Sequence, residues 1–547
     1  MLIKEARVWP PGGGQTPEQA PEQASGQEAE RATGQATGQA SEGATGQAAE
    51  RATGQAAEQA WAGIPRTDVR LAGGQITACG PGLRPAPGED VIEADGGLLL
   101  PGLHDHHVHL RALAAAAASV AAGPPDTRTA AELAARLRAA DAELPQGAWL
   151  RAVGYHESVA GPLDRDVLDR LVPHRPVRVQ HRTGALWMVN SPGAALLGLD
   201  GCDLDGVERD GFGRPTGRLW RLDRWLAARM PGPSQDGASQ KGASQKGASQ
   251  DTTGLGAVSQ AAASLGVTGF TDATPGATAA YLAALAAAPV AQRLLCMAPA
   301  GVDPPADAGP GAGGSGAGGP GAGGRGAGGP VTAGPEKVLL DDDTLPALDA
   351  LASRIGRAHA AGRPVAVHCV TRVQLVLTLA ALDLAGRHPG DRIEHGAVIG
   401  AASMAGLRGL TVVTQPNFIA ERGAQYAAEV PPEDWPDLWR LRSLITAGVT
   451  VAAGTDAPFG LADPWHAMRG ATDRPPPFGT SEAVPAATAV ALFLGQPAAP
   501  GVQRRVAAGQ PGDLALLRAG PLEALRALSS DLVAVTLVGG EVCYRRG

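Results

Sequence analysis

Eight short apolar runs, separated by stretches rich in alanine and leucine, constrain the fold of this chain more than any other feature. Short buried strands that alternate with helices are typical of a parallel α/β fold. Eight such strands are the number that closes a (β/α)8 barrel. The sequence therefore predicts an α/β protein with a TIM barrel over residues 98–499. The expected strands are 98–110, 266–273, 293–298, 337–340, 364–369, 392–396, 411–416 and 449–457.

The two ends of the chain carry short alternating segments that differ from the middle. LIKEARVW and DVRLAGGQITACG precede the barrel, and GDLALLRAG and LVAVTLVGGEVCYR follow it. A Gly-Gly pair between two alternating runs indicates a β-hairpin. We expect residues 1–10 and 62–97 to join 500–547 in a small composite β-sandwich domain. A long excursion between the first two barrel strands, at about 144–235, is expected to form a lid subdomain over the barrel mouth.

Three segments have the composition of inserts. Residues 11–61 repeat ATGQA units, residues 233–251 repeat GASQK, and residues 303–334 repeat GAGG. Segments with almost no large apolar side chains cannot bury enough surface to offset the entropy lost on ordering. We expect all three to be low-complexity inserts outside the folded core, although a role as a scaffold or partner-binding arm stays open.

Charge and cysteine content exclude several classes of protein. The net charge is −8, and Lys and Arg are scattered among acids, which argues against a nucleic-acid surface. The five cysteines are far apart and form no CxxC pair, so neither a disulfide framework nor a thiolate zinc site is expected. The first residues, MLIKEARVWP, lack the apolar core of a signal peptide, and the alanine-rich runs are too weakly apolar to span a membrane. These features favour the cytoplasm.

Polar residues stand at the ends of several expected strands. In HDHHVHL, His107 and His109 are two positions apart, so on a strand their imidazoles point to the same face. Two histidines on one face make half of a metal site, because a catalytic zinc typically takes three protein ligands and a water. His368, His395 and Asp456 each end another apolar run, which is where barrel enzymes place their catalytic groups.

Lys337 opens KVLLDDD on the expected fourth strand. A buried lysine is costly as a bare cation. It could stand at an exposed strand start. Alternatively, addition of CO2 to its amine would give an anionic carbamate able to bridge two metal ions.

The order H-x-H, Lys, His, His, Asp along such a barrel resembles the amidohydrolase superfamily. The strings LLLPGLHDHHVHL, IEHG, TQPN, GTDAPFG and GQPGDLALL support the resemblance, which covers about residues 62–547 apart from the two later inserts. The long excursion, with VNS at 189–191 and PTGRLW at 215–220, is similar to the branch that includes N-substituted formamide deformylase. That branch often has D-G-H before VNS, whereas this chain has Ala185 where that histidine would fall.

The resemblance implies a metal-dependent hydrolase that cleaves a non-peptide C–N bond of a small molecule, of the amide or formamide type. His107, His109 and Asp456 would bind one divalent ion, most simply zinc, and His368 and His395 a second. Lys337, if carboxylated, would bridge them, and a one-metal site without Lys337 is the alternative. The metal would lower the pKa of a bound water toward 7, and Asp456 would carry its proton to the leaving nitrogen.

Other residues near these positions are weaker candidates. Glu394, Asp105 and Cys369 adjoin ligand histidines, and strand alternation predicts that they face away and serve structure. The lid and the loop after the seventh strand supply the candidates for substrate binding, which are Tyr155, His156, His181, Arg218, Trp220 and Gln415.

Several alternatives stay open at this stage. A deaminase acting on a heterocycle and a cyclic amidase would use the same metal-activated water. A catalytically inactive binding barrel would keep the ligands for structure alone. Iron, manganese or nickel could replace zinc, and a homo-oligomer is possible.

Overall fold

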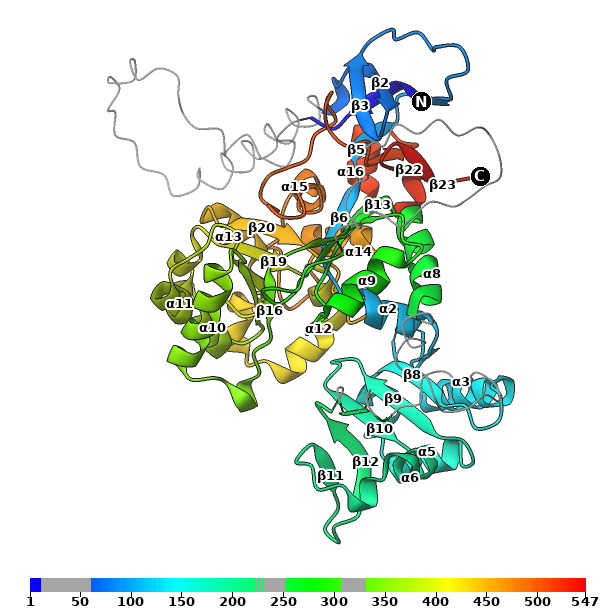
Figure 1. Ribbon diagram of the computed structural model, residues 1–547, viewed down its shortest axis with the longest axis vertical. Coiled ribbons are helices and arrows are strands. Elements are labelled where there is room, and N and C mark those ends of the chain that lie inside the picture. Colours follow the sequence, from blue (N-terminus) through cyan, green and yellow to red (C-terminus); the bar gives the residue numbers. More distant parts are fainter. Residues whose placement is uncertain (11–60, 125, 223–224, 227–228, 230–250, 306–330) are drawn as a thin grey trace, which may run out of the picture.

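The computed structural model describes residues 1–10, 61–124, 126–222, 225–226, 229, 251–305 and 331–547. Three lobes follow one another along its longest axis (Figure 1). The upper lobe holds both ends of the chain, the middle lobe holds two parallel sheets with their helices, and the lower lobe is a mixed sheet with its own helices.

The upper lobe contains strands from both ends of the chain. Strand β5 pairs in parallel with β1 and antiparallel with β21, so it joins the early strands to the late ones. All strands of this lobe are hydrogen-bonded into one eight-stranded sheet. The expected β-sandwich would have two separate sheets, and the strand pairing shows one. Its strands are β1 (Leu2–Val8), β2 (Arg66–Ala72), β3 (Gln75–Gly80), β4 (Val91–Glu93), β5 (Leu98–Pro101), β21 (Leu514–Leu517), β22 (Val533–Val538) and β23 (Glu541–Arg545).

The run 98–110, predicted as one strand, is instead two strands in two different lobes. Strand β5 ends at Pro101, and β6 (Leu103–Val108) begins after Gly102 in the middle lobe. Gly102 lies where a Cβ atom would come within 2.0 Å of Thr268 Cγ2, so the turn packs directly on strand β13 (Val267–Asp272). Only a residue without a side chain fits this close approach, and the domain boundary falls here rather than at residue 97.

Substitution Gly102→Ala is expected to lower the free energy of unfolding by about 1–3 kcal/mol, because a methyl group would overpack a buried contact. Gly211→Ala is the matched control, since nothing lies within 4 Å of its Cβ position. Urea unfolding followed by circular dichroism measures both. Equal midpoints for the two variants would contradict the steric argument.

The middle lobe contains two parallel sheets whose strands follow the chain order. The first has four strands, β6, β13, β14 (Arg293–Cys296) and β15 (Val331–Ala333). The second has five, β16 (Glu336–Val338), β17 (Val365–Cys369), β18 (Arg392–His395), β19 (Thr411–Thr414) and β20 (Thr450–Ala453). Each of the eight expected runs overlaps a parallel strand, and β15 is an additional one.

Among the described residues, the strands of the two sheets do not pair into one closed ring. On one side, only Gly334 and Pro335 separate β15 from β16 in the chain. Proline has no amide hydrogen, so Pro335 cannot donate a hydrogen bond to a neighbouring strand. On the other side, the segment after β20 is bonded to β6, because the Asp456 amide donates to the His107 carbonyl oxygen at 2.8 Å. The His109 amide donates in turn to the Ala457 carbonyl oxygen at 2.9 Å.

Helices surround these sheets, and their starts are encoded locally. The α11 helix begins with a capping box, in which Thr371 and Gln374 satisfy each other's backbone amides. The helices of the middle lobe are α2 (Leu110–Ala117), α8 (Asp251–Ser264), α9 (Ala279–Ala287), α10 (Leu348–Ala360), α11 (Arg372–Ala385), α12 (Asn417–Glu429), α13 (Leu441–Thr446), α14 (Pro464–Thr472) and α15 (Ala486–Ala491). Helix α16 (Pro521–Ala527) lies between β21 and β22 in the chain.

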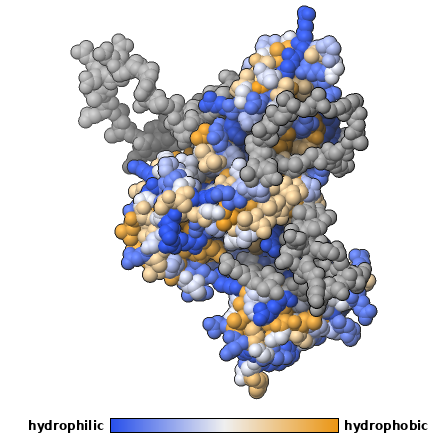
Figure 2. Space-filling view, in the orientation of Figure 1, coloured by the Kyte–Doolittle hydropathy of each residue, from blue (hydrophilic) through white to orange (hydrophobic). Residues whose placement is uncertain are grey.

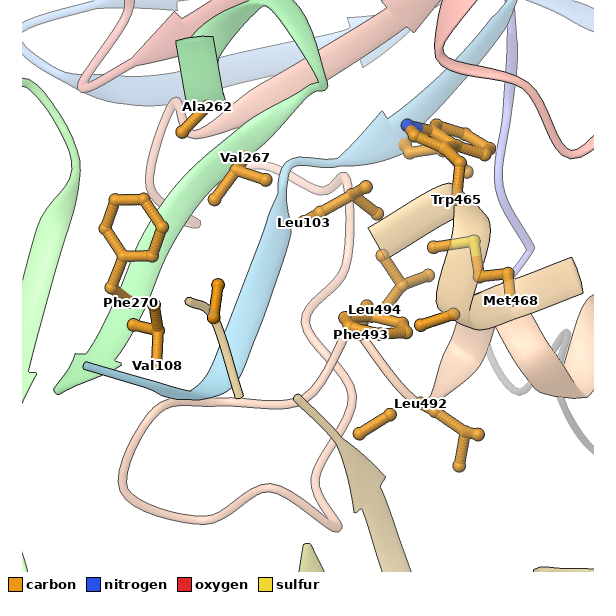
Figure 3. Close-up of a cluster of buried hydrophobic side chains, with 14 of the residues drawn as sticks. Leu103, Val108, Ala262, Val267, Phe270, Trp465, Met468, Leu492, Phe493 and Leu494 are labelled. Carbon is orange, nitrogen blue, oxygen red and sulfur yellow. The ribbon is translucent and has the colours of Figure 1, made fainter. Parts of the chain in front are cut away.

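The largest apolar cluster lies where β6 and β13 meet α14 (Figure 3). Trp465 is 1% exposed, and its indole nitrogen donates to the Leu265 carbonyl oxygen at 2.8 Å. Leu103 and Val108 at the two ends of β6 are also buried in this cluster. The strand that carries the H-x-H motif is therefore fixed by packing along its length.

The lower lobe contains most of the segment predicted as a lid, and we keep the name lid for it; its sheet begins before residue 144. Its sheet starts at β7 (Val120–Ala121), which pairs with β8 (Leu150–Tyr155), and helix α3 (Ala130–Glu143) lies between them in the chain. The remaining elements are α4 (Glu157–Ala160), α5 (Arg165–Leu171), β9 (Val177–His181), β10 (Leu186–Val189), α6 (Ser191–Leu197), β11 (Val207–Arg209) and β12 (Pro215–Trp220).

The expected inserts fall almost wholly outside the described residues. Of 11–61 only Trp61 is described, with its ring centroid 4.9 Å from that of Trp9, and of 233–251 only Asp251, at the start of α8. The third range, 303–334, extends too far, because residues 331–333 form β15 and Val331 is buried.

Hydrophilic and apolar atoms are interspersed on the face shown in Figure 2. Val373, Val376 and Leu384 of α11 are more than half exposed. Of the helices described, none has the length and apolarity needed to cross a bilayer.

Candidate metal centre

The H-x-H motif places two imidazoles beside one carboxylate. His107 and His109 Nε2 lie 3.5 and 3.1 Å from Asp456 Oδ1. One potential ligand atom from each of these three residues lies within 4.8 Å of the others. A catalytic metal site typically has three protein ligands with nitrogen and oxygen donors, and these three side chains provide such a set.

Asp456 reaches this position through a tight turn after β20. Its φ is 56°, in the left-handed region that non-glycine residues seldom adopt. Gly454 allows the turn to approach β6, because a Cβ there would lie 2.5 Å from the His107 amide nitrogen. The Asp105 carboxylate accepts hydrogen bonds from the Thr455 amide at 3.0 Å and from the Thr455 hydroxyl. Asp105 thus holds the turn that presents Asp456, and burial raises the pKa of Asp105 to about 6.

Two further histidines lie at the ends of neighbouring strands: His368 is the last residue but one of β17, and His395 ends β18. The ring centroids of His368 and His395 are 4.5 Å apart, and those of His395 and His107 are 4.7 Å apart. His395 Nδ1 is 2.8 Å from Gln415 Oε1. The structure therefore brings both histidines to the same centre as the H-x-H pair, and it places Gln415 behind His395 rather than among the other substrate candidates.

Lys337 on β16 also points into the centre. Its Nζ lies 3.4 Å from His107 Nε2, and the residue is 7% exposed. Burial lowers the pKa of Lys337, partly offset by the Glu394 and Asp456 carboxylates. All six residues expected to bind metal thus lie in one cluster.

Alternation along the strand predicts that Glu394 faces away from the site. The structure instead places the Glu394 side chain against His107. Its carboxylate is hydrogen-bonded to His107 Nδ1, and both side chains are fully buried. His395 has a φ of 69°, which breaks the extended backbone and allows residues 394 and 395 to face the same region. Arg392, two positions earlier on the same strand face, pairs with Glu394. The charged pair R-x-E within a buried strand is the sequence signal that could have revealed both residues.

The donor set fits a divalent cation. Burial lowers the pKa of His107 and of His395 well below the usual value and that of His368 to about 3, so these imidazoles are neutral near pH 7. A neutral imidazole has one lone pair available to a metal. Asp456 Oδ1 is buried and accepts no hydrogen bond. Buried polar atoms normally have a partner, and a bound cation would provide one for this oxygen.

Most of the lid residues proposed for substrate binding form hydrogen bonds with other residues of the lid. The Tyr155 hydroxyl donates to the Gly161 carbonyl oxygen, and the Tyr155 side chain is fully buried. Arg218 Nε and Trp220 Nε1 both donate to Glu208 Oε2, at 3.1 and 3.0 Å. Tyr155 and Arg218 therefore support the lid sheet, and the 42% exposed Trp220 is at its surface.

His156, Glu157 and His181 form a second cluster of potential ligands in the lid. Each histidine accepts a backbone amide hydrogen at Nδ1, from Ser158 at 3.1 Å and from Thr183 at 3.3 Å. The hydrogen of the neutral ring is then on Nε2, and that of His181 points at the Glu157 carboxylate 2.9 Å away. This tautomer leaves no nitrogen lone pair for a cation, so the cluster suits hydrogen bonding rather than metal.

The lid is fastened to the middle lobe close to the metal centre. Arg182 contacts Gln425 on α12, and Arg221 contacts Asp341 in the segment after β16. A Cβ on Gly184 would lie 2.6 Å from the ring of Phe459, which packs edge-on against His109 with centroids 5.2 Å apart. Phe459, which sequence reasoning did not single out, therefore connects the lid to a potential ligand.

Comparison with known proteins identifies the family of the chain. A sequence model of the amidohydrolase family matches residues 90–544, and the chain belongs to this family of hydrolases. It is similar to the N-substituted formamide deformylase of Arthrobacter pascens, with 28% identity over 163 residues. That match covers 28% of this chain and 30% of the relative, less than a third of its length.

Two solved structures share the fold. An uncharacterized metal-dependent hydrolase from Pyrococcus furiosus aligns with a TM-score of 0.59 and 16% identity, over 84% of this chain and 97% of its own. A second, from Pyrococcus horikoshii, aligns with the same TM-score and identity over 83% and 94%. The fold of these two proteins therefore extends over most of this chain.

Proposed function

We propose that this amidohydrolase cleaves a non-peptide C–N bond, of the amide or formamide type, in a small molecule. The observation that carries the proposal is the convergence of His107, His109 and Asp456 at the ends of two parallel strands, with potential ligand atoms within 4.8 Å. The similarity of part of the chain to a formamide deformylase favours a linear amide over a heterocycle.

We further propose that the two parallel sheets are the arcs of a (β/α)8 barrel. The backbone bonds of Asp456 and Ala457 to the H-x-H segment join them on one side. His107, His109 and Asp456 would hold one divalent ion, with zinc the natural choice for this donor set, and His368 and His395 a second. Lys337, carboxylated, would bridge the two. When bound, such ions polarise a carbonyl group and lower the pKa of water.

The chain's own residues supply the proton transfer. Asp456 is the one carboxylate among the six clustered residues, so its oxygens are the base that would accept the proton of the attacking water. The same carboxylic acid would then donate that proton to the leaving nitrogen. Asp105 keeps the turn in place during both steps through its bonds to Thr455. The lid, fastened by Arg182 and Arg221, would exclude bulk water.

Metal content per chain tests the site. Protein purified without chelator is expected to contain about two divalent ions, and Lys337→Met about one or none, because the lysine would be the shared ligand. Lys4→Met is the control, since Lys4 lies on β1 in the upper lobe. Elemental analysis measures the metal content of the parent, of Lys337→Met and of Lys4→Met. One ion in both the parent and Lys337→Met would make the site mononuclear, and a folded parent without metal would refute the proposal.

A substrate panel tests the reaction. N-substituted formamides and other linear amides are expected to release an amine together with formate or another carboxylate. Turnover restricted to aminated heterocycles, with release of ammonia, would replace the proposal by a deaminase. Turnover restricted to cyclic amides would replace it by a ring-opening amidase, and metal binding with no turnover on any class would favour an inactive binding barrel.

A further inference from the structure

The two nitrogens of His107 have separate partners that define its tautomer. Nδ1 is hydrogen-bonded to the Glu394 carboxylate, which can only accept, so Nδ1 carries the hydrogen. Nε2 lies 3.4 Å from Lys337 Nζ, which can donate to a lone pair there. His107 therefore presents a lone pair toward Asp456 and the other potential ligands.

Glu394 is itself paired with a buried arginine. The Arg392 guanidinium contacts both of its oxygens, through Nε and, at 3.3 Å, through Nη2. The same Nη2 donates to the His106 carbonyl oxygen at 2.7 Å, so the pair connects β18 to β6. Arg392 is 3% exposed, and Glu394 and His107 are fully buried. In such surroundings a carboxylate acts on its hydrogen-bond partner with little screening by water.

His395 has a different kind of partner. Its Nδ1 is 2.8 Å from the amide oxygen of Gln415, whose own Nε2 lies 3.5 Å from the Val413 carbonyl oxygen. An amide is neutral, and hydrogen bonds to a charged acceptor are roughly twice as strong as those between neutral groups. A carboxylate behind an imidazole raises its basicity as a ligand. The two histidines thus differ in the group that supports each one.

We propose that Arg392 and Glu394 are positioning residues that make the two metal positions unequal. The position formed by His107, His109 and Asp456 fills first and binds its ion more tightly than the position formed by His368 and His395. This inference rests on the proposed metal-dependent function. It adds the order in which the two metal positions fill. It attributes that order to Arg392 and Glu394, which are not themselves metal ligands.

Competition with a chromophoric chelator tests the order on the full-length protein, with zinc as the probe. The parent is expected to bind zinc in two steps. Glu394→Gln is expected to weaken the tighter step by about 10–100-fold, the usual effect of losing a carboxylate behind a ligand histidine, and to leave the weaker step unchanged. Gln415→Glu is expected to tighten the weaker step. Glu433→Gln, on an exposed side chain, is the control.

The variants need a check on folding, because Glu394→Gln leaves the buried Arg392 without its partner. The double variant Arg392→Gln/Glu394→Gln removes both charges together and is expected to show the same weakening with the circular dichroism spectrum of the parent. A parent without zinc would refute the proposed function itself. Two-step binding by the parent, with the tighter step unchanged in the folded double variant, would overturn only the inference about loading.

Discussion

Asp456→Asn is expected to reduce turnover by about 10²–10⁴-fold, the range that proton transfer by a positioned side chain contributes. The amide has nearly the shape of the carboxylate, and the backbone contacts of the turn do not depend on the Asp456 side chain, because the Asp456 amide bonds to the His107 carbonyl oxygen. The variant therefore loses the base and one charged ligand without losing the turn.

Turnover on the best amide of the panel and metal content are measured on the same preparations, so that loss of the base is separated from loss of the ion. Asp473→Asn is the matched control, because Asp473 is exposed at the end of α14. Turnover of Asp456→Asn within about tenfold of the parent at equal metal content would contradict the role of Asp456 as the base, since this is below the range for proton transfer.

Trp465→Ala is expected to lower the free energy of unfolding by about 3–5 kcal/mol, the usual cost of removing a large buried aromatic side chain. The indole is 1% exposed among the residues around β6 and also donates a hydrogen bond to Leu265 (Figure 3). Its loss leaves a cavity and an unpaired carbonyl oxygen next to the strand that carries the H-x-H motif.

Circular dichroism during urea unfolding reports this change without depending on tryptophan fluorescence. Phe212→Ala is the control, because Phe212 is 98% exposed and its removal is expected to shift stability by less than about 0.5 kcal/mol. Similar midpoints for the two variants would show that the cluster around Trp465 does not support the fold as its packing indicates.

The sequence predicts the parallel strands of the middle lobe well, because each is a short apolar run between helical stretches. It also predicts that His107, His109, His368, His395 and Asp456 meet, since the ends of parallel strands meet at one edge of a sheet. The break at Gly102 could not be predicted, because its cause is a contact with Thr268, which is distant in sequence. Strand β15 was missed because it follows a glycine-rich repeat and has only three residues.

Errors at the site have a different physical origin. Alternation predicts side-chain direction only for regular strands, and the positive φ of His395 breaks that regularity next to Glu394. The contact of Phe459 with His109 and Gly184 depends on how the lid sits against the middle lobe. The bonds of Tyr155 and Arg218 within the lid depend in the same way on tertiary packing.

The pairing of β5 with β21 has a consequence for how the protein is made. Strand β5 is separated from β6 by one residue, and one of its hydrogen-bonding edges is occupied by residues 514–516. During translation this edge stays open until β21 is made, which is after every strand of the middle lobe. An open strand edge invites pairing with another chain. Interrupted synthesis is therefore expected to leave the edge of β5 open to pairing with another chain.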